Sequence, residues 1–234
     1  MTNEIILIIN IFLVYGGVLL WLYLFGEHGL IAFTSFATIV ANIEVLVIVN
    51  AFGMEMTLGN ILFASTFLVT DILSELYGKA SSKKAVNIGI ITSFSMIVIT
   101  FFWMYYEPAS SDWAYPSIKA IFSNTPRFMF VSLIVYAIVQ KFDVWAYHKW
   151  WDFTEKKCGD RRKYLWVRNN FSTLISQFLN NLLFSFGAFI GVYSIKSIWN
   201  IIISSYIIYI VTSICDTPII YLARKIPTGV LNKK

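Results

Sequence analysis

Charged residues are scarce in this chain of 234 residues, at 13% of the total, against about 25% in a typical soluble domain. Two cysteines, Cys158 and Cys215, are too few for a disulfide framework. The two histidines, His28 and His148, have no Cys, His or Asp neighbour at metal-ligand spacing. Phosphate-binding loops and nucleophile motifs are also missing. The sequence therefore predicts no cofactor, no metal site and no nucleotide hydrolysis.

Apolar residues are abundant instead: they make up 58% of the chain, and the mean hydropathy is +0.69. A helix needs about 20 mostly apolar residues to cross a hydrocarbon layer about 30 Å thick. Pro126 suits the first position of one such helix, after a cap at Asn124 or Thr125. We predict an all-α integral membrane protein of about seven transmembrane helices. They span residues 5–25, 30–52, 58–77, 86–106, 126–147, 165–193 and 198–222.

Lysine and arginine divide unevenly between the two sets of loops, which predicts orientation because cytoplasmic loops collect these residues. The smaller set contains Lys119, Arg127 and Lys196. The net charge of +5 then reflects topology, and nucleic acid is not an expected partner. We expect a multi-pass plasma (inner) membrane protein with its N-terminus outside and its C-terminus in the cytoplasm. The larger set contains Lys79, Lys83, Lys84, Lys141, Lys149, Lys156, Lys157, Arg161, Arg162, Lys163, Arg168, Arg224, Lys225, Lys233 and Lys234.

Two carboxylates share a face of the third predicted helix, because Asp71 and Glu75 are four residues apart. A charge within hydrocarbon costs several kcal/mol on insertion scales (about 2.5–3.5 for Asp), so each needs a partner or a function. For Glu75, a purely structural role is the alternative to a functional one, as an ion pair with Lys79 near the cytoplasmic end of the helix. Asp71 lies deeper, and we expect it to have a functional role.

The sixth predicted helix carries a polar stripe of Asn170, Thr173, Gln177 and Asn181 at helical spacing, with Arg168 below it. Amides also form hydrogen bonds between packed membrane helices, which would explain one or two of them. Four on one helix favour the wall of a polar cavity.

Three other acidic residues lie within predicted helices. Glu44 is placed near the middle of the membrane, either as a proton carrier or beside a polar neighbour. Asp143 is expected to be an ion-pair partner at the interface. Asp216 lies beside the helix-breaking Pro218, where it either binds a ligand or marks the inner interface.

Five segments together resemble the queuosine precursor transporter family, also called the vitamin uptake transporter family. The resemblance runs from about residue 30 to the C-terminus. Many members have Asp where this chain has Asn180. The segments are Ala41-Asn42-Ile43; Thr70-Asp71-Ile72-Leu73-Ser74-Glu75-Leu76-Tyr77-Gly78-Lys79; Lys141-Phe142-Asp143-Val144 with Tyr147 and Lys149; Arg168-Asn169-Asn170 with Ser172-Thr173 and Ser176-Gln177; and Asp216-Thr217-Pro218 with Tyr221.

This resemblance implies uptake of 7-deazaguanine precursors of queuosine, such as 7-cyano- and 7-aminomethyl-7-deazaguanine or queuine, across a bacterial inner membrane. It also implies a core similar to the six-helix substrate-binding subunits of energy-coupling-factor vitamin importers. Residues 30–234 would form that core, and residues 1–29 would add an N-terminal transmembrane helix.

A deazaguanine ring presents two adjacent donors, N1–H and the 2-amino group, which one carboxylate can accept together. Asp71 or Glu75 would serve, in a cavity formed by the third, fifth and sixth helices toward the cytoplasmic half. Tyr77 and Phe171 are candidates for stacking on the ring. The full predicted substrate site is Asn42, Asp71, Glu75, Arg168, Asn170, Gln177 and Asn180.

Three functional classes remain open at this point. We favour a stand-alone transporter, whose partners are a small deazapurine and the lipid bilayer. The first alternative is a substrate-binding subunit that needs a separate energising module, and a homo-oligomer is also open. The last alternative is a membrane-embedded enzyme or structural helper, although no catalytic residues are predicted.

Overall fold

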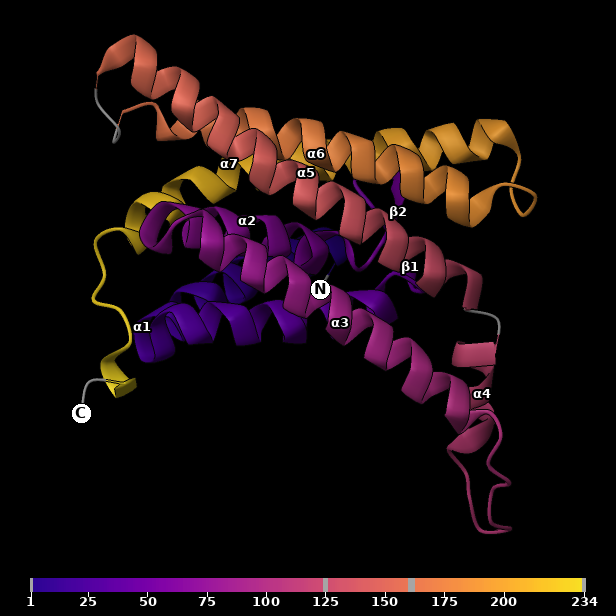
Figure 1. The fold of residues 1–234 in the computed structure, drawn as a ribbon. Helices are drawn as coiled ribbons and strands as arrows, with labels where there is room; N and C mark the ends of the chain where they lie inside the picture. The colour runs from indigo at the N-terminus through magenta and orange to yellow at the C-terminus, as the bar shows by residue number, and fades with distance from the viewer. Residues whose placement is uncertain (1, 124–125, 160–162, 233–234) are drawn as a thin grey trace.

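The computed structural model describes residues 2–123, 126–159 and 163–232, in which helices dominate (Figure 1). Asn124, Thr125, Arg161, Arg162, Lys233 and Lys234, named above for a cap and for charge, lie outside these residues, as does the side chain of Cys158. The elements are α1 (Asn3–Glu44), β1 (Ile48–Ala51), β2 (Met54–Thr57), α2 (Asn60–Tyr77), α3 (Lys79–Trp103), α4 (Tyr115–Ser123), α5 (Pro126–Cys158), α6 (Leu165–Phe189), α7 (Ile195–Ala223) and the 3-10 helix η1 (Val230–Asn232).

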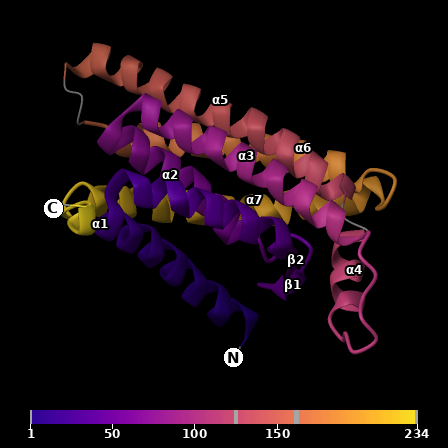
Figure 2. The ribbon, with the colours of Figure 1, turned by 60° about the horizontal axis from the view of Figure 1, so that its bottom comes forward.

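Helix α1 folds back on itself at Gly26, whose φ of 63° and ψ of −135° are not helical. A positive φ favours glycine, because other residues pay a steric cost there. Both ends of α1 therefore lie beside the β-hairpin: Asn3 donates to the carbonyl of Asn50 at 2.8 Å, and Val45 follows the last helical residue. Figure 2 shows the two arms of α1 diverging from this bend. The first two predicted helices are thus the two arms of α1.

The second predicted helix is too long, because α1 ends at Glu44 and the chain then forms an antiparallel hairpin of β1 and β2. The hairpin turns at Phe52 and Gly53, both with positive φ. Hydropathy missed this turn because residues 45–51 are almost as apolar as a helix. Glu44 is consequently the half-buried last residue of α1 and does not lie within a helix that continues to residue 52.

The remaining long helices run back and forth between two ends of the molecule. α5 packs along α6, and α6 along α7, while α3 and α2 join this group to α1 (Figure 1). We call the end with β1 and β2 the hairpin end. At the other end, called here the Gly26 end, a Cβ on Gly26 would lie 3.3 Å from the Tyr77 hydroxyl. The largest apolar cluster lies between α1, α2 and the end of α7.

Four of the described helices are long and apolar enough to cross a membrane: α1, α3, α5 and α7. Their outer faces expose large apolar side chains such as Phe12, Ile91, Ile134 and Ile214, as expected for surfaces that contact lipid. α2 and α6 together hold half of the buried polar side chains of the described residues. α4 lies outside this bundle (Figure 1).

Candidate functional site

A cavity lies inside the half of the bundle nearer the hairpin end. Its volume is about 50 Å³, enough for a few water molecules, so a larger solute requires the wall to move apart. Seven segments contribute to its wall: the end of α1, β2, the start of α2, and α3, α5, α6 and α7. Its polar lining comprises Thr38, Asn42, Thr57, Asn60, Ser93, Ser132, Tyr136, Asn180, Asn181, Ser185, Ser205 and Tyr209, and its large apolar lining includes Phe63, Phe184, Phe189 and Ile201.

Three of the four amides in the cavity wall are held by other residues. Asn42 accepts from Ser132 at 2.9 Å and donates to the carbonyl of Thr38 at 2.8 Å. Asn60 accepts from Thr57 at 2.8 Å and from Tyr209 at 3.2 Å. Asn181 donates to the carbonyl of Ile202 at 2.6 Å. These bonds hold the wall in place. Most of them join two segments of the chain, and the bond from Asn42 to Thr38 lies near the end of α1.

Asn180 differs from these three amides. Its side chain is 6% exposed and lines the cavity, yet it forms no hydrogen bond with any residue in the described part of the chain. The amide atoms of Asn180 are not themselves fully buried. Asn180 therefore presents two donors and an acceptor to whatever occupies the cavity.

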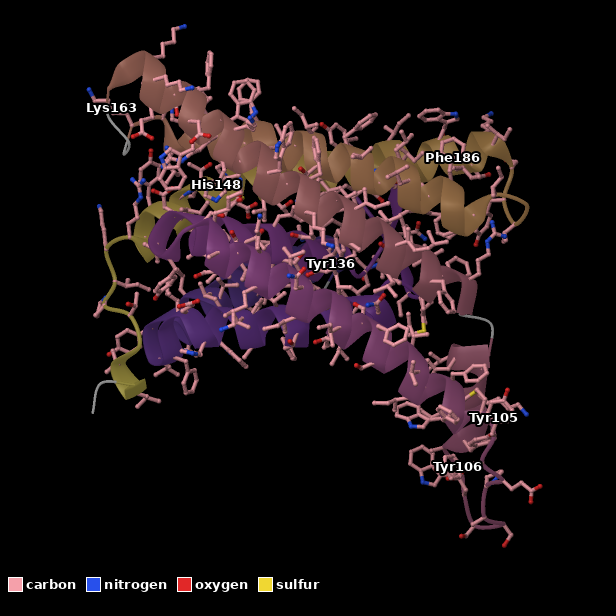
Figure 3. All side chains as sticks on the ribbon, in the orientation of Figure 1. Tyr105, Tyr106, Tyr136, His148, Lys163 and Phe186 are labelled. Atoms are coloured by element: carbon pink, nitrogen blue, oxygen red, sulfur yellow. The ribbon has the colours of Figure 1, made fainter. Side chains whose placement is uncertain are left out.

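Aromatic rings form a second part of the wall. Phe63 and Tyr136 meet edge to face, with centroids 6.2 Å apart. The hydroxyl of Tyr136 faces Thr38 without a partner at hydrogen-bonding distance. Figure 3 shows Tyr136 between α3 and α5, far from the exposed Tyr105 and Tyr106. The ring packs directly on Gly89, where a Cβ would lie 3.0 Å from its Cζ. Flat rings beside free hydrogen-bonding groups suit a planar polar ligand.

Three aspartates are buried further along the same helices: Asp71 on α2, Asp143 on α5 and Asp216 on α7. Each is at most 1% exposed. Asp71 accepts from Thr173 at 3.1 Å, whereas no oxygen of Asp143 or Asp216 has a hydrogen-bond partner. Among the described residues, no lysine or arginine forms an ion pair with any of the three. The expected interfacial ion pair of Asp143 was therefore wrong.

Glu75 lies at the Gly26 end and joins four helices. Its Oε2 accepts from Nη2 of Arg168 at 2.6 Å and from the hydroxyl of Tyr147 at 2.9 Å. Its Oε1 accepts from Arg224. The guanidinium of Arg168 also lies 4.4 Å from the centre of the Trp151 ring, a favourable cation–π distance. Both oxygens of Glu75 accept from side chains of the protein, and the alternative pair with Lys79 does not form.

The structure separates the seven predicted site residues into three pairs and one single residue. Asn42 and Asn180 line the cavity. Asp71 and Gln177 are buried between the cavity and the Gly26 end, where neither amide atom of Gln177 has a partner. Glu75 and Arg168 form the ion pair described above. Asn170 lies apart from all of these and donates to Thr217 at 2.8 Å.

The two predicted stacking residues do not line the cavity. Phe171 is 47% exposed and packs against Trp150 on the outer surface. The hydroxyl of Tyr77 lies beside Gly26. Proximity to a motif in the sequence was a poor guide, because successive helical residues point in different directions.

The sequence analysis did not identify Tyr136, Tyr209 or the electrostatic interaction of Asp143 with Asp216. The spacing of polar residues along α5 and α7 could have indicated them. Tyr136, Gln140, Asp143 and Tyr147 follow at spacings of four, three and four residues, which place them on one face of α5. Ser205, Tyr209, Thr212 and Asp216 repeat the same spacing on α7. All eight side chains are at most 5% exposed. The helices α5, α6 and α7 thus each direct a stripe of polar side chains toward the interior of the bundle.

Residues that could hold a metal ion do not gather anywhere within 2–123, 126–159 and 163–232. The chemistry that the site offers is therefore hydrogen bonding, aromatic contact and buried negative charge. These are the interactions by which a site can bind and orient a solute.

Two comparisons with known proteins agree with this description. Residues 57–223 match the family described as "Putative vitamin uptake transporter". The chain is also similar to the "Probable queuosine precursor transporter" of Bacillus subtilis (strain 168), with 35% identity over 208 residues that cover 89% of each protein. No solved structure matches the chain.

Proposed function

This chain belongs to the vitamin uptake transporter family and is a membrane transport protein, not an enzyme; on that premise we propose that it imports queuosine precursors. The proposed substrates are 7-cyano-7-deazaguanine, 7-aminomethyl-7-deazaguanine and queuine. The name of the Bacillus relative supports this substrate class, and the cavity supports a planar base.

The single observation that carries the proposal is the unpartnered Asn180 in a wall of aromatic rings and fixed amides. The amide oxygen of Asn180 would accept from the N1–H or 2-amino group of the base, and its NH₂ would donate to the ring carbonyl. Phe63, Tyr136 or Phe184 would cover the flat faces. Asn42 and Asn60 hold the wall in place and would contact the ligand only at its edge.

The remaining predicted residues take other roles in this proposal. Glu75 and Arg168 close the Gly26 end, because their ion pair ties α2 to α6 and excludes water there. Asn170 fixes α6 against α7 through Thr217. In this proposal, substrate enters the cavity from the hairpin end while the Gly26 end is closed.

The topology proposed is seven crossings with the hairpin end outside. A continuous helix of 42 residues would be about 63 Å long, roughly twice the hydrocarbon thickness. The reversal at Gly26 makes two crossings of it, and α2, α3, α5, α6 and α7 supply five more. The basic residues Lys79, Lys83 and Lys84 then lie at the cytoplasmic end. Residues 30–234 would correspond to the six-helix core and residues 1–29 to the added helix.

The test is rescue of queuosine synthesis in bacteria that can neither make nor import its precursors. The chain is expressed, each precursor is supplied at nanomolar concentration, and queuosine is measured in tRNA. We expect modification to return with at least one precursor. No return, with the protein present in the membrane, would contradict stand-alone import of these solutes.

Experiments on the purified protein distinguish a stand-alone carrier from a substrate-binding subunit. Reconstituted alone in liposomes, a stand-alone carrier exchanges labelled for unlabelled precursor across the membrane. A subunit that needs an energising module binds the precursor in detergent and shows no exchange. The Glu75–Arg168 ion pair favours the first outcome, because its opening and closing would let this chain admit and release substrate without a second protein.

A further inference from the structure

The three buried aspartates form a group that substrate binding does not use. Asp71 interacts electrostatically with both Asp143 and Asp216, and Asp216 interacts with Asp143. Three carboxylates in mutual range cannot all be ionised at low cost in a medium of low dielectric constant. No basic side chain in the described part of the chain forms an ion pair with any of them. A positive charge from outside the protein is needed at this place.

Other ionisable groups around the three aspartates add no positive charge. Asp71 faces Glu75, one turn further along α2, and Thr173 of α6. Asp216 faces Tyr15 of α1 and its neighbour Cys215. Arg168 lies nearby, but its guanidinium is taken up by Glu75, Tyr147 and the carbonyl of Lys163.

Unpartnered neutral groups lie near the same place. The hydroxyl of Ser176 is fully buried and faces Asp143, without a partner at hydrogen-bonding distance. Gln177 is fully buried, lies on the α6 face that carries Thr173, and has no partner at either amide atom. A hydroxyl and an amide can donate to an ionised carboxylate or accept from a protonated one, and a proton on Asp143 would remove a buried charge.

The aspartates lie between the cavity and the closed end. Asp143 follows Tyr136 by seven residues, Asp216 follows Tyr209 by seven, and Thr173 precedes Asn180 by seven. Seven helical residues rise about 10 Å, so the group lies two turns from the cavity on three helices. Asp71 lies one turn from Glu75 on α2. A cation that binds here would therefore lie close enough to influence both the cavity and the Glu75–Arg168 ion pair at the closed end.

A proton fits this place better than a metal ion. The described residues contain no group of three Asp, Glu, His or Cys side chains close enough to hold a metal. A carboxyl group, by contrast, binds a proton without any other ligand.

We propose that Asp71, Asp143 and Asp216 form a proton-binding site that couples substrate import to proton entry, a role that rests on the proposed function. One proton from the hairpin side binds a carboxylate and makes that group neutral. The loaded protein then opens the Glu75–Arg168 contact, and the proton leaves with the substrate on the other side. The proton is the only species transferred besides the substrate.

The first experiment uses purified full-length protein in liposomes with tritiated 7-cyano-7-deazaguanine as the probe. Exchange without any gradient tests carriage of the solute, and accumulation under an imposed pH or sodium gradient tests coupling. We expect exchange, and accumulation of about tenfold per pH unit if one proton is coupled to one substrate. Asp143→Asn should keep exchange and lose accumulation under the pH gradient. The exposed Asp152, also on α5, gives the matched control Asp152→Asn, which should behave as wild type.

The second experiment needs no substrate. Infrared spectra of the protein in detergent are recorded across a pH titration, and the carbonyl band of protonated carboxylic acids is followed. We expect this band at neutral pH, with a loss of intensity in Asp143→Asn and in Asp216→Asn and none in Asp152→Asn. Ser176→Ala should shift the band without removing it, which serves as a second variant if an aspartate variant does not fold.

The outcomes separate this inference from the proposed function. No exchange by wild type overturns the proposed substrate, and the infrared titration still decides on the protons. Accumulation driven by sodium alone, or an Asp143→Asn protein that accumulates as well as wild type under the pH gradient, overturns proton coupling. Absence of the carboxylic acid band at neutral pH overturns the proton-binding site itself.

Discussion

Arg168 donates from Nη2 to Oε2 of Glu75 at 2.6 Å, and the two side chains are 0% and 4% exposed. The pair joins α6 to α2 at the end of the bundle opposite the cavity. Removal of one partner from a buried ion pair typically costs about 3–5 kcal/mol, because the other charge is left uncompensated.

Glu75→Ala should therefore lower the thermal unfolding midpoint of the purified protein more than Glu75→Gln, which keeps a hydrogen-bond acceptor for Arg168. Arg168→Lys should also be harmful, since an ammonium cannot reproduce the guanidinium contacts to Glu75 and the Trp151 ring. Glu55 is exposed on β2, so Glu55→Gln is the matched control. Equal midpoints for Glu75→Ala and the control would contradict a structural role for the pair.

Gly89 allows the ring of Tyr136 to reach the cavity wall. A Cβ at this position would overlap the Tyr136 hydroxyl and lie 3.0 and 3.1 Å from two of its ring carbons. Gly89→Ala should push the ring into the cavity and weaken precursor uptake at least tenfold. Gly16→Ala is the control, because a Cβ there meets nothing within 4 Å. Uptake by Gly89→Ala at the level of Gly16→Ala would show that the ring does not shape the substrate site.

Asn180 should be the side chain on which precursor affinity depends most. Asn180→Ala removes a donor and an acceptor and leaves groups of the ligand unpaired, at about 1–3 kcal/mol, or roughly a five- to 150-fold rise in Kd. Asn87→Ala changes an exposed amide on α3 and should leave Kd unchanged. The measurement is equilibrium binding of labelled 7-cyano-7-deazaguanine to purified protein. A Kd for Asn180→Ala within twofold of wild type would place the substrate elsewhere.

The orientation of the chain is open to labelling with a membrane-impermeant maleimide. In a background of Cys158→Ser and Cys215→Ser, we expect Ser111→Cys in the loop before α4 to react in intact cells. Lys157→Cys near the end of α5 should react only after the cells are opened. Both positions are exposed in the structure, so access depends on the side of the membrane. The reverse pattern would turn the proposed topology around and place the cavity opening in the cytoplasm.

Family membership could be inferred from the sequence because it rests on short motifs such as that of Asp71 and Glu75, whose order survives without any structure. The positions of most helices could be inferred as well, since runs of apolar residues mark α2, α3 and α7 to within several residues. The hairpin after Glu44 could not, because β-branched apolar residues suit a strand as well as a membrane helix.

The candidate site divides in the same way. The sequence by itself determined that polar groups such as Asp71, Gln177 and Asn180 occur within membrane helices, where each requires a partner or a role. Only the tertiary structure decided which of them share a cavity, because that depends on how each helix is rotated and paired. Packing placed Asn42 and Asn180 in the wall of one cavity, brought Asp143 and Asp216 into electrostatic range of Asp71, and joined Glu75 to Arg168. Contacts between residues 93 positions apart arise from the fold of the whole bundle, and no local pattern encodes them.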